Sequence, residues 1–272
     1  METVIEHIAV LTVAGSDSGG GAGIQADLKT FAAFGVYGTS VITAITAQNL
    51  AGVTAVHPVD ADVVRRQLLA VLSGYPVRAI KTGMLFSAGI IEAVADVLAG
   101  FRSIPLVIDP VFAATSGSRL IEESGIQALI ARLFPLASLI TPNMPEAEII
   151  TGMSLKEEPD LERAAAAMFA HFGVPVLLKG GHLVGEAADV LRDERGLRAF
   201  RSERVRNVNT HGTGCTFSAA IAAGMAKGTL LRPAVENAKA YIFECLRHSH
   251  PLTPEVSVLD HFCRKEQGPS RG

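Results

Sequence analysis

Residues 209–220, NTHGTGCTFSAA, place two glycines around a threonine, followed by a cysteine and a run of small and apolar residues. Gly212 and Gly214 allow the backbone to turn sharply and to approach a ligand closely. The run from Cys215 onward predicts the first turn of a helix, where unpaired N–H groups and the positive end of the helix dipole collect. This stretch therefore predicts an anion site suited to a phosphate group.

Cys215 is the residue of this stretch that could react. A thiol in the field of a helix N-terminus has a lowered pKa, so we expect part of Cys215 to be thiolate at neutral pH. The alternative is a glycine hinge before a buried helix, with Cys215 as a small core residue, because short glycine motifs are common.

Two polar residues near the start of the chain could recognise a ring. Asp27 lies three residues after Ile24 and four before Phe31, beside the inward face of a predicted helix. Its carboxylate either accepts hydrogen bonds from nearby N–H groups or meets a polar ligand. Gln48 follows an apolar run and offers both a donor and an acceptor, which suits a heteroaromatic ring with adjacent nitrogen and amine. A glutamine at the end of a strand is, however, more often only solvated.

Carboxylates and a lysine later in the chain could handle a triphosphate. Asp109 precedes a proline, and Glu146 lies three residues after Asn143. Such carboxylates could place Mg²⁺ around phosphates, although the Asn143/Glu146 pair equally matches a capping box. Lys179 follows three apolar residues and precedes two glycines, so its amine either meets a phosphate or is an ordinary exposed lysine.

Apolar runs alternate with helical patterns, which predicts a mostly parallel sheet with helices on both faces. Strands are expected at residues 8–14, 36–47, 79–82, 106–108, 138–141 and 176–178, with a hairpin after the last. Helices are expected from residue 24, from a cap at Asp60 to about 72, from a cap at Ser87 to about 98, and at 121–134, 161–172, 215 onward and 233–247. Sites in such folds lie beyond the carboxyl ends of the strands, where these polar residues fall: Asp17, Gln48, Met84, Asp109, Asn143 and Lys179.

Composition limits the class of protein. The chain has 272 residues, of which 49% are hydrophobic and 19% charged, so one large α/β domain is expected rather than a disordered chain. We expect a core at about residues 8–250 and a loose tail at 251–272. A net charge of −3 without a basic block argues against a nucleic-acid partner. The glycine loop at residues 15–23 lacks the spacing of a P-loop, which disfavours a Walker-type NTPase.

Cysteine usage and the first residues bear on location. The three cysteines, Cys215, Cys245 and Cys263, are odd in number and lack metal-ligand spacing, which fits a reduced cytosol. The first apolar run is short and follows no basic region, so it predicts a strand rather than a signal peptide or a membrane span.

Seven motifs together resemble those of a known family. The chain is similar to the hydroxymethylpyrimidine/phosphomethylpyrimidine kinases of thiamine biosynthesis, in the ribokinase-like superfamily, over roughly residues 8–247. The motifs are, in order, AGSDSGGGAGIQADLKTF, VITAITAQN, KTGML, DPV, TPNMPEAE, LLKGGH and NTHGTGCTFSAA. The resemblance implies a three-layer sandwich, a cytoplasmic homodimer, ATP and Mg²⁺ as cofactors, and two successive phosphorylations of 4-amino-5-hydroxymethyl-2-methylpyrimidine.

The resemblance also implies roles for individual residues. The aminopyrimidine would be bound by Gln48 and Asp27, between walls formed by Gly15, Met84 and Val111. ATP would be bound by Asn143, Glu146, Lys179 and Thr210, and Mg²⁺ would be placed by Asp109 and Glu146. The backbone amides of an anion hole would come from Gly212, Thr213, Gly214 and Cys215. Lys179 would neutralise the transferring phosphate, and Cys215 would accept the proton of the substrate hydroxyl.

The chain departs from the family pattern at three places. Ser18 and Gly19 stand where the family commonly has Pro-Ser, which makes the substrate loop more flexible. Thr115 takes a place where a lysine is frequent, so a positive charge that could help to hold the already phosphorylated substrate is missing, and the second phosphorylation is less firmly implied than the first. The C-terminal segment resembles the usual glycine-rich ending only loosely.

Other functions stay open at this point. A vitamin kinase acting on pyridoxine or pyridoxal would share the fold and the cysteine-ended motif, although Gln48 and Met84 favour a pyrimidine. A non-catalytic sensor of the pyrimidine would not need Cys215, Glu146 and Lys179 together. A ribokinase-like sugar kinase is disfavoured because it would carry an aspartate in place of the cysteine.

Overall fold

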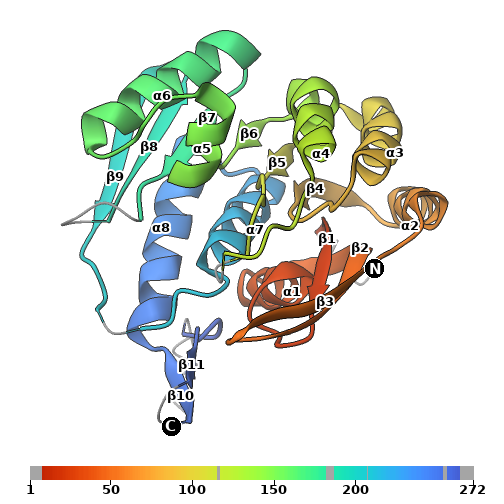
Figure 1. Ribbon diagram of the computed structural model, residues 1–272, viewed down its shortest axis with the longest axis horizontal. Helices are drawn as coiled ribbons and strands as arrows, with labels where there is room; N and C mark the ends of the chain where they lie inside the picture. Colours follow the sequence, from red (N-terminus) through yellow and green to blue (C-terminus); the bar gives the residue numbers. More distant parts are fainter. Residues whose placement is uncertain (1–7, 115–116, 182–186, 207, 254–255, 264–272) are drawn as a thin grey trace, which may run out of the picture.

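A large twisted sheet forms the centre of the molecule (Figure 1). In this computed structural model the described residues are 8–114, 117–181, 187–206, 208–253 and 256–263. Within them nine strands form one sheet in the order β3-β2-β1-β4-β5-β6-β7-β8-β9. These strands are β1 Ala9–Asp17, β2 Tyr37–Asn49, β3 Gly52–Pro58, β4 Val77–Thr82, β5 Leu106–Ile108, β6 Leu139–Ile140, β7 Val176–Lys179, β8 Ala187–Asp193 and β9 Gly196–Ser202.

The direction of the strands places the site. The six central strands are parallel to one another, while β3 at one edge and β8 and β9 at the other pair antiparallel. The carboxyl ends of the parallel strands therefore meet along one edge of the sheet, where α/β proteins bind ligands. The expected fold class, a mostly parallel sheet covered on both faces, is confirmed.

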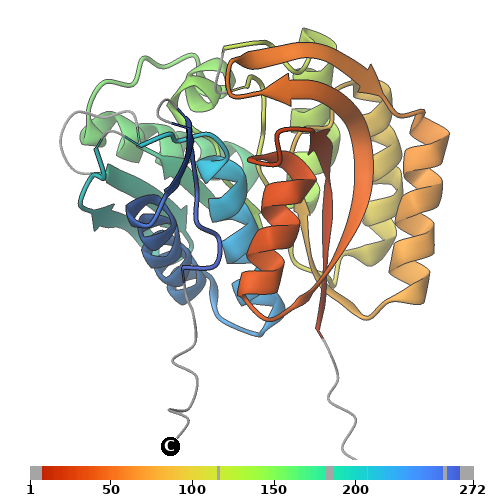
Figure 2. The same ribbon diagram turned by 90° about the horizontal axis from the view of Figure 1, so that it is seen from below.

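Helices cover both faces of the sheet. On one face α1, α7 and α8 pack together, and the turned view of Figure 2 shows α1 (red) beside α7 (light blue). On the other face lie α2 to α6. The helices are α1 Gly23–Ala33, α2 Ala61–Gly74, α3 Ala88–Leu98, α4 Glu123–Ala128, α5 Met144–Thr151, α6 Glu158–Phe172, α7 Thr213–Ala226 and α8 Leu231–Arg247.

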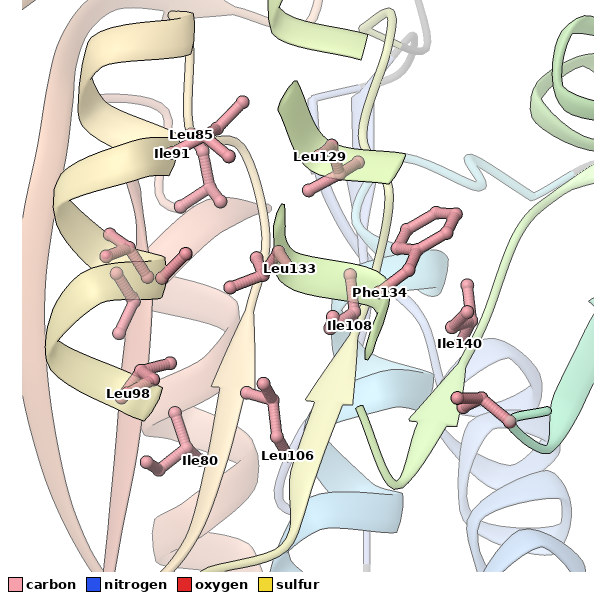
Figure 3. Packing of buried hydrophobic residues seen from close by; sticks show 14 of the residues in the cluster. Ile80, Leu85, Ile91, Leu98, Leu106, Ile108, Leu129, Leu133, Phe134 and Ile140 are labelled. Atoms are coloured by element: carbon pink, nitrogen blue, oxygen red, sulfur yellow. The ribbon is translucent and has the colours of Figure 1, made fainter. Parts of the chain in front are cut away.

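The continuous apolar runs of the central strands divide between the two faces. In β5, Leu106 and Ile108 pack into the core beneath α2 to α6, while Val107 between them packs against α7 and α8. Successive side chains of a strand point to opposite faces, so a strand buried on both sides needs apolar residues throughout. Figure 3 shows the first of these cores, in which Ile108 of β5 lies beside Leu133 and Phe134.

The capping residues in the sequence predicted most helix ends correctly. The side chains of Asp60 and Ser87 accept hydrogen bonds from the first turns of α2 and α3, as predicted. The helix predicted at residues 121–134 is shorter and irregular: α4 is followed by a π-helical stretch, Leu129–Leu133, and a 3₁₀ turn, Phe134–Leu136. Pro135 lacks an N–H group and cannot continue an α-helix, which accounts for the end of this segment.

The expectation of a loose tail from residue 251 is wrong for its described part. Strands β10 His250–Thr253 and β11 Val256–Val258 form an antiparallel pair. Leu259 and His261 beyond them are only 7% and 4% exposed. Among the described helices none is both long and apolar enough to cross a lipid bilayer. Thr115, at which the chain departs from the family pattern, lies outside the described residues.

Candidate active site

A cavity of about 480 Å³ lies at the carboxyl ends of the parallel strands. All the residues that were predicted to bind or react line it, except Asp27. The predicted residues in its wall are Gly15, Gln48, Met84, Asp109, Val111, Asn143, Glu146, Lys179, Thr210, Gly212, Thr213, Gly214 and Cys215. The sheet topology thus brings together segments that are up to 200 positions apart (Gly15 and Cys215).

The turn before α7 requires a glycine at position 212. Gly212 is the N-cap of α7 with φ +82°, and a Cβ there would lie 1.8 Å from the backbone oxygen of Gly21. A Cβ on Gly214 would lie 3.3 Å from Lys179 Nζ and 3.9 Å from Asp109 Oδ2. The first turn of α7, with its amide donors and positive dipole end, therefore lies against a lysine and a carboxylate at the cavity wall.

Cys215 lies in the first turn of α7, but its ionisation differs from the expectation. Burial raises the pKa of the thiol to about 11, and Asp27 and Asp109 add to the effect, while Lys81 opposes it. The predicted thiolate at neutral pH is therefore wrong for the protein without ligand. Partial loss of hydration at the cavity wall outweighs the field of the helix N-terminus.

Lys179 and Asp109 form an ion pair inside the cavity. The distance from Lys179 Nζ to Asp109 Oδ1 is 2.6 Å, and the two side chains are 13% and 3% exposed. Burial lowers the pKa of Lys179, but Asp109 and Glu146 outweigh it and leave the pKa raised. Asp109 also accepts hydrogen bonds from Thr141 and Ser218, each at 3.3 Å. Lys179 is thus a charged cavity residue rather than an ordinary exposed lysine.

Asn143 and Glu146 form the capping box that their spacing predicts. Asn143 Oδ1 accepts from the Glu146 backbone N–H at 2.9 Å, and Glu146 Oε2 accepts from the Asn143 N–H at 2.7 Å. Glu146 is nevertheless a cavity residue, 4% exposed. Burial raises its pKa to about 8, although the charge of Lys179 opposes this rise. The capping interpretation is confirmed, and it leaves a carboxyl group in the cavity wall beside Lys179.

Asp27 does not contact the cavity, which corrects its assignment to the pyrimidine. Its two oxygens accept from Lys81 Nζ at 2.8 and 2.9 Å, and Oδ2 also accepts from Thr12 Oγ1 at 2.5 Å. Both side chains of the Asp27–Lys81 pair are 0% exposed. Burial lowers the pKa of Lys81, but the charge of Asp27 outweighs it and leaves the pKa raised. The carboxylate therefore pairs with Lys81, a lysine of the cavity wall that no local pattern had indicated as its partner.

The glycine loop after β1 is organised by Asp17. Its carboxylate accepts from the backbone N–H groups of Gly19, Gly21 and Ala22 at 2.8 to 3.0 Å. His211 Nε2 lies 3.0 Å from Asp17 Oδ2, which ties this loop to the turn before α7 across the cavity. Burial raises the pKa of Asp17, but His211 and the loop amides outweigh it and leave the pKa lowered. His211 stands inside the glycine–cysteine motif, and its role was missed because only the fold brings it to Asp17.

The opposite end of the cavity is largely apolar. A Cβ on Gly15 would lie 3.1 Å from Met84 Sδ, so glycine keeps space between these walls. Met84 and Val111 pack in one small apolar cluster. Thr46 Oγ1 lies 3.2 Å from Gln48 Oε1, which orients the amide group at the rim. A flat ring with polar edges fits this combination of apolar walls and one amide.

Metal binding at this site would require help from a ligand. Among the described residues no group of three or more His, Cys, Asp or Glu side chains could hold a metal ion alone. Asp109 and Glu146 are two carboxyl groups in one wall, and Mg²⁺ is usually held by one or two carboxylates together with phosphate oxygens and water. The donors present therefore fit Mg²⁺ that arrives with a phosphate.

Proteins with related sequences include several hydroxymethylpyrimidine/phosphomethylpyrimidine kinases. The family model described as phosphomethylpyrimidine kinase matches residues 17–259. A hydroxymethylpyrimidine/phosphomethylpyrimidine kinase of Streptomyces coelicolor is 46% identical over 93% of both chains. The thiamine biosynthesis bifunctional protein of Geobacter sulfurreducens is 49% identical over 95% of this chain, which spans about half (53%) of that longer protein.

Solved structures show the same fold. A phosphomethylpyrimidine kinase from Clostridium difficile 630 has 45% sequence identity and a TM-score of 0.78, covering 87% of this chain and 98% of its own. A Bacillus subtilis pyridoxal kinase, solved as an ADP complex, has 40% identity and a TM-score of 0.85 over 94% and 97% of the two chains. On the family match and these identities, the chain belongs to the phosphomethylpyrimidine kinase family, which has the ribokinase-like fold.

Proposed function

We propose that this protein is an ATP-dependent kinase that phosphorylates 4-amino-5-hydroxymethyl-2-methylpyrimidine to its monophosphate and then to the diphosphate, in thiamine biosynthesis. One observation carries the proposal: the amides of α7, Lys179 and Asp109 converge at one part of a cavity whose other walls are apolar and carry Gln48. The first part suits a phosphoryl group and the second an aminopyrimidine. The similarity covers 93% of the Streptomyces kinase, which supports the same activity.

The ion pair between Lys179 and Asp109 has a natural role in phosphoryl transfer. When a triphosphate enters, Lys179 exchanges its carboxylate partner for phosphate oxygens, because its ammonium already lies at the first turn of α7. Asp109 and Glu146 would then hold Mg²⁺ with the phosphate oxygens, and the ion supplies positive charge on the transferring group. The amides of Gly214 and Cys215 donate to the same group, so catalysis rests on positioning and charge stabilisation.

Cys215 is our candidate for the group that accepts the proton of the substrate hydroxyl. Its raised pKa makes the thiolate scarce at neutral pH, so the enzyme would be faster at higher pH until other groups titrate. Proton removal need not be complete in the transition state of phosphoryl transfer, so a scarce but strong base suffices.

A pyridoxal kinase is the second candidate function. The observation that favours it is the likeness to the Bacillus subtilis pyridoxal kinase, whose TM-score of 0.85 exceeds the 0.78 of the Clostridium enzyme. The family match and the named relatives favour the pyrimidine. Gln48 sharpens the choice, because a donor and an acceptor match the amine and ring nitrogen of an aminopyrimidine.

Substrate choice is tested by incubating the purified protein with Mg–ATP and, separately, hydroxymethylpyrimidine, its monophosphate, and pyridoxal. Mass spectrometry of the products and the three kcat/KM values give the answer. We expect the pyrimidine and its monophosphate to be phosphorylated at least tenfold more efficiently than pyridoxal, a difference of about 1.4 kcal/mol in transition-state binding. Preferential turnover of pyridoxal would overturn the proposal. Slow turnover of the monophosphate alone would point to Thr115.

The homodimer implied by the resemblance is also a prediction. Light scattering of the protein as it leaves a size-exclusion column measures the mass of the particle. A mass twice that of the 28.6 kDa chain is the expected result, and a mass equal to the chain would contradict it.

A further inference from the structure

The C-terminal segment, residues 250–253 and 256–263, follows α8 and forms the β10–β11 pair before it returns toward the first turns of α7 (Figure 1). Its strand residues are partly or fully exposed, yet Leu259 and His261 beyond them are buried. An exposed hairpin that leads into a buried stretch needs anchors, and the anchors of this segment fall at two places beside the phosphate-binding turn, residues 209–214.

The first anchor is Ser257 on β11. Its hydroxyl accepts from the backbone N–H of Asn209 at 3.3 Å, and its backbone oxygen accepts from Asn209 Nδ2 at 3.2 Å. Asn209 Oδ1 in turn accepts from the backbone N–H of His211 at 2.9 Å. The chain of contacts runs from Ser257 through Asn209 to the residue directly before Gly212, so it reaches the N-cap of α7 from outside the cavity.

The second anchor is His261. Its Nε2 lies 3.0 Å from Thr216 Oγ1, and Thr216, next to Cys215 in α7, is fully buried. The hydroxyl of Tyr241 on α8 donates to the His261 backbone oxygen at 2.7 Å, which fixes the segment from the other side. Burial lowers the pKa of His261 to about 4, so the ring is neutral at physiological pH and this contact does not depend on its charge.

These two anchors enclose a turn that needs support. Its glycines make it flexible, whereas amide donors help a transition state only when they are held within a fraction of an ångström. We propose that Ser257 and His261 are positioning residues of the phosphate-binding turn: they hold Asn209 at its start and Thr216 beyond its end, so that the amides of Gly214 and Cys215 face the cavity. This assignment rests on the proposed kinase function and extends the site to the last described part of the chain.

Hydrogen–deuterium exchange of the full-length protein tests the proposal without turnover. The variants are Ser257→Ala, His261→Leu and His261→Gln, and the matched controls are Ser73→Ala on α2 and His171→Leu on α6, both exposed in the wild type. We expect Ser257→Ala and His261→Leu to speed exchange of a peptide covering residues 209–216 about tenfold, the effect of losing one hydrogen bond. Exchange across β8 and β9 should stay unchanged, and His261→Gln, whose amide can reach Thr216, should restore protection.

Affinity and rate provide the second readout. Titration calorimetry with AMP-PCP and Mg²⁺ should give a Kd raised about tenfold in Ser257→Ala, and kcat should fall while the KM for the pyrimidine is retained. Unchanged exchange at residues 209–216, or faster exchange over the whole chain, would overturn the positioning role. If His261→Leu does not fold, the same measurements on Ser257→Ala decide the question.

The same measurements separate this proposal from the proposed function. Selective exchange at the turn in a protein that phosphorylates neither the pyrimidine nor pyridoxal would uphold the anchors and refute the kinase assignment. An active wild type whose anchor variants keep normal exchange, AMP-PCP affinity and kcat would refute the anchors alone.

Discussion

Two lysine–aspartate pairs lie near the cavity, and they differ in their access to it. Lys81 on β4 and Asp27 on α1 are both 0% exposed, with a separation of 2.8 Å. Lys179 at the end of β7 and Asp109 after β5 are 13% and 3% exposed, with a separation of 2.6 Å. Asp27 lies behind the wall of the cavity, and Lys81 lines it without exposing its side chain, whereas Asp109 and Lys179 both line the cavity beside the first turn of α7.

This difference in exposure implies a difference in role. The Asp27–Lys81 pair is sealed from solvent, and both Asp27 oxygens accept from Lys81, so the pair holds α1 on the sheet, and breaking it leaves one charge buried and unpaired. A pair at the surface of a cavity can exchange its carboxylate for a phosphate at small cost. We therefore assign a structural role to the Asp27–Lys81 pair and a role in phosphoryl transfer to the Asp109–Lys179 pair. Cys215, whose pKa is affected by Asp27, Lys81 and Asp109, lies between them.

The largest expected effect comes from the pair that faces the cavity. Lys179→Met removes the ammonium that would meet the transferring phosphate, so kcat should fall about 10³-fold or more. The melting temperature should fall less than in Lys81→Met, because Asp109 lines the cavity and keeps Thr141 and Ser218 as donors. Lys156→Met, an exposed lysine, is the control. Turnover within a few fold of wild type would remove Lys179 from the chemistry.

Cys215→Ala should lower kcat about 10²- to 10⁴-fold while substrate KM is retained, since general-base catalysis contributes in this range. The raised pKa of about 11 adds a sharper test. In the wild type kcat should increase with pH between 7 and 9, and iodoacetamide should alkylate Cys215 faster over the same range, because the thiolate becomes more abundant. In Cys215→Ala, kcat should no longer increase with pH over this range. Near-normal turnover of Cys215→Ala would mean that the backbone amides suffice.

Lys81→Met should break the sealed pair and cost about 3–5 kcal/mol of unfolding free energy, because it leaves Asp27 charged and buried. The double variant Lys81→Met/Asp27→Leu should recover most of this loss, since two apolar side chains replace two charges. Urea denaturation measures both values. If the single variant is as stable as the wild type, the pair is not the structural element that we assign.

Glu146→Gln separates the cap from the carboxyl group in the cavity. The amide oxygen can still accept from the Asn143 N–H, so the loss of stability should stay near or below about 1 kcal/mol, whereas the KM for Mg²⁺ should rise about tenfold. Activity assayed against Mg²⁺ concentration at fixed ATP gives that KM. An unchanged KM for Mg²⁺ would mean that Glu146 only caps α5 and does not help to hold the metal ion.

The same variant gives a pH test of stability. The pKa of Glu146 is raised from 4.5 to about 8, so the folded wild type holds a proton that the unfolded chain has lost between these values. The wild type should therefore lose stability relative to Glu146→Gln as pH rises from 5 to 8. Urea denaturation of both proteins at the two pH values measures the difference, and a parallel response would contradict the raised pKa.

Sequence patterns predicted positions better than ionisation states. The alternation of strands and helices was enough to place Gln48, Asp109 and Lys179 at one edge of a parallel sheet. The partner of Asp27 was not predictable, because Lys81 is 54 positions away and meets it only when α1 packs on the sheet that contains β4. The prediction of a lowered pKa for Cys215 was wrong for the same reason, since the burial of this thiol depends on segments that are distant in sequence.

Tertiary contacts also explain the other misses. The tail was expected to be loose because its residues are polar, yet His261 is buried against Thr216. His211 was not predicted as a link, although it stands in the most informative motif, because its partner Asp17 comes from the first strand. In both cases the local sequence carries no sign of the partner.

A crystal structure with AMP-PCP, Mg²⁺ and hydroxymethylpyrimidine would test the central claim most directly. We predict that Lys179 Nζ lies within hydrogen-bond distance of the terminal phosphate and no longer contacts Asp109, while Lys81 remains on Asp27 at the present 2.8 Å. Lys179 still paired with Asp109, with the terminal phosphate bound away from the first turn of α7, would contradict the division of roles between the two pairs.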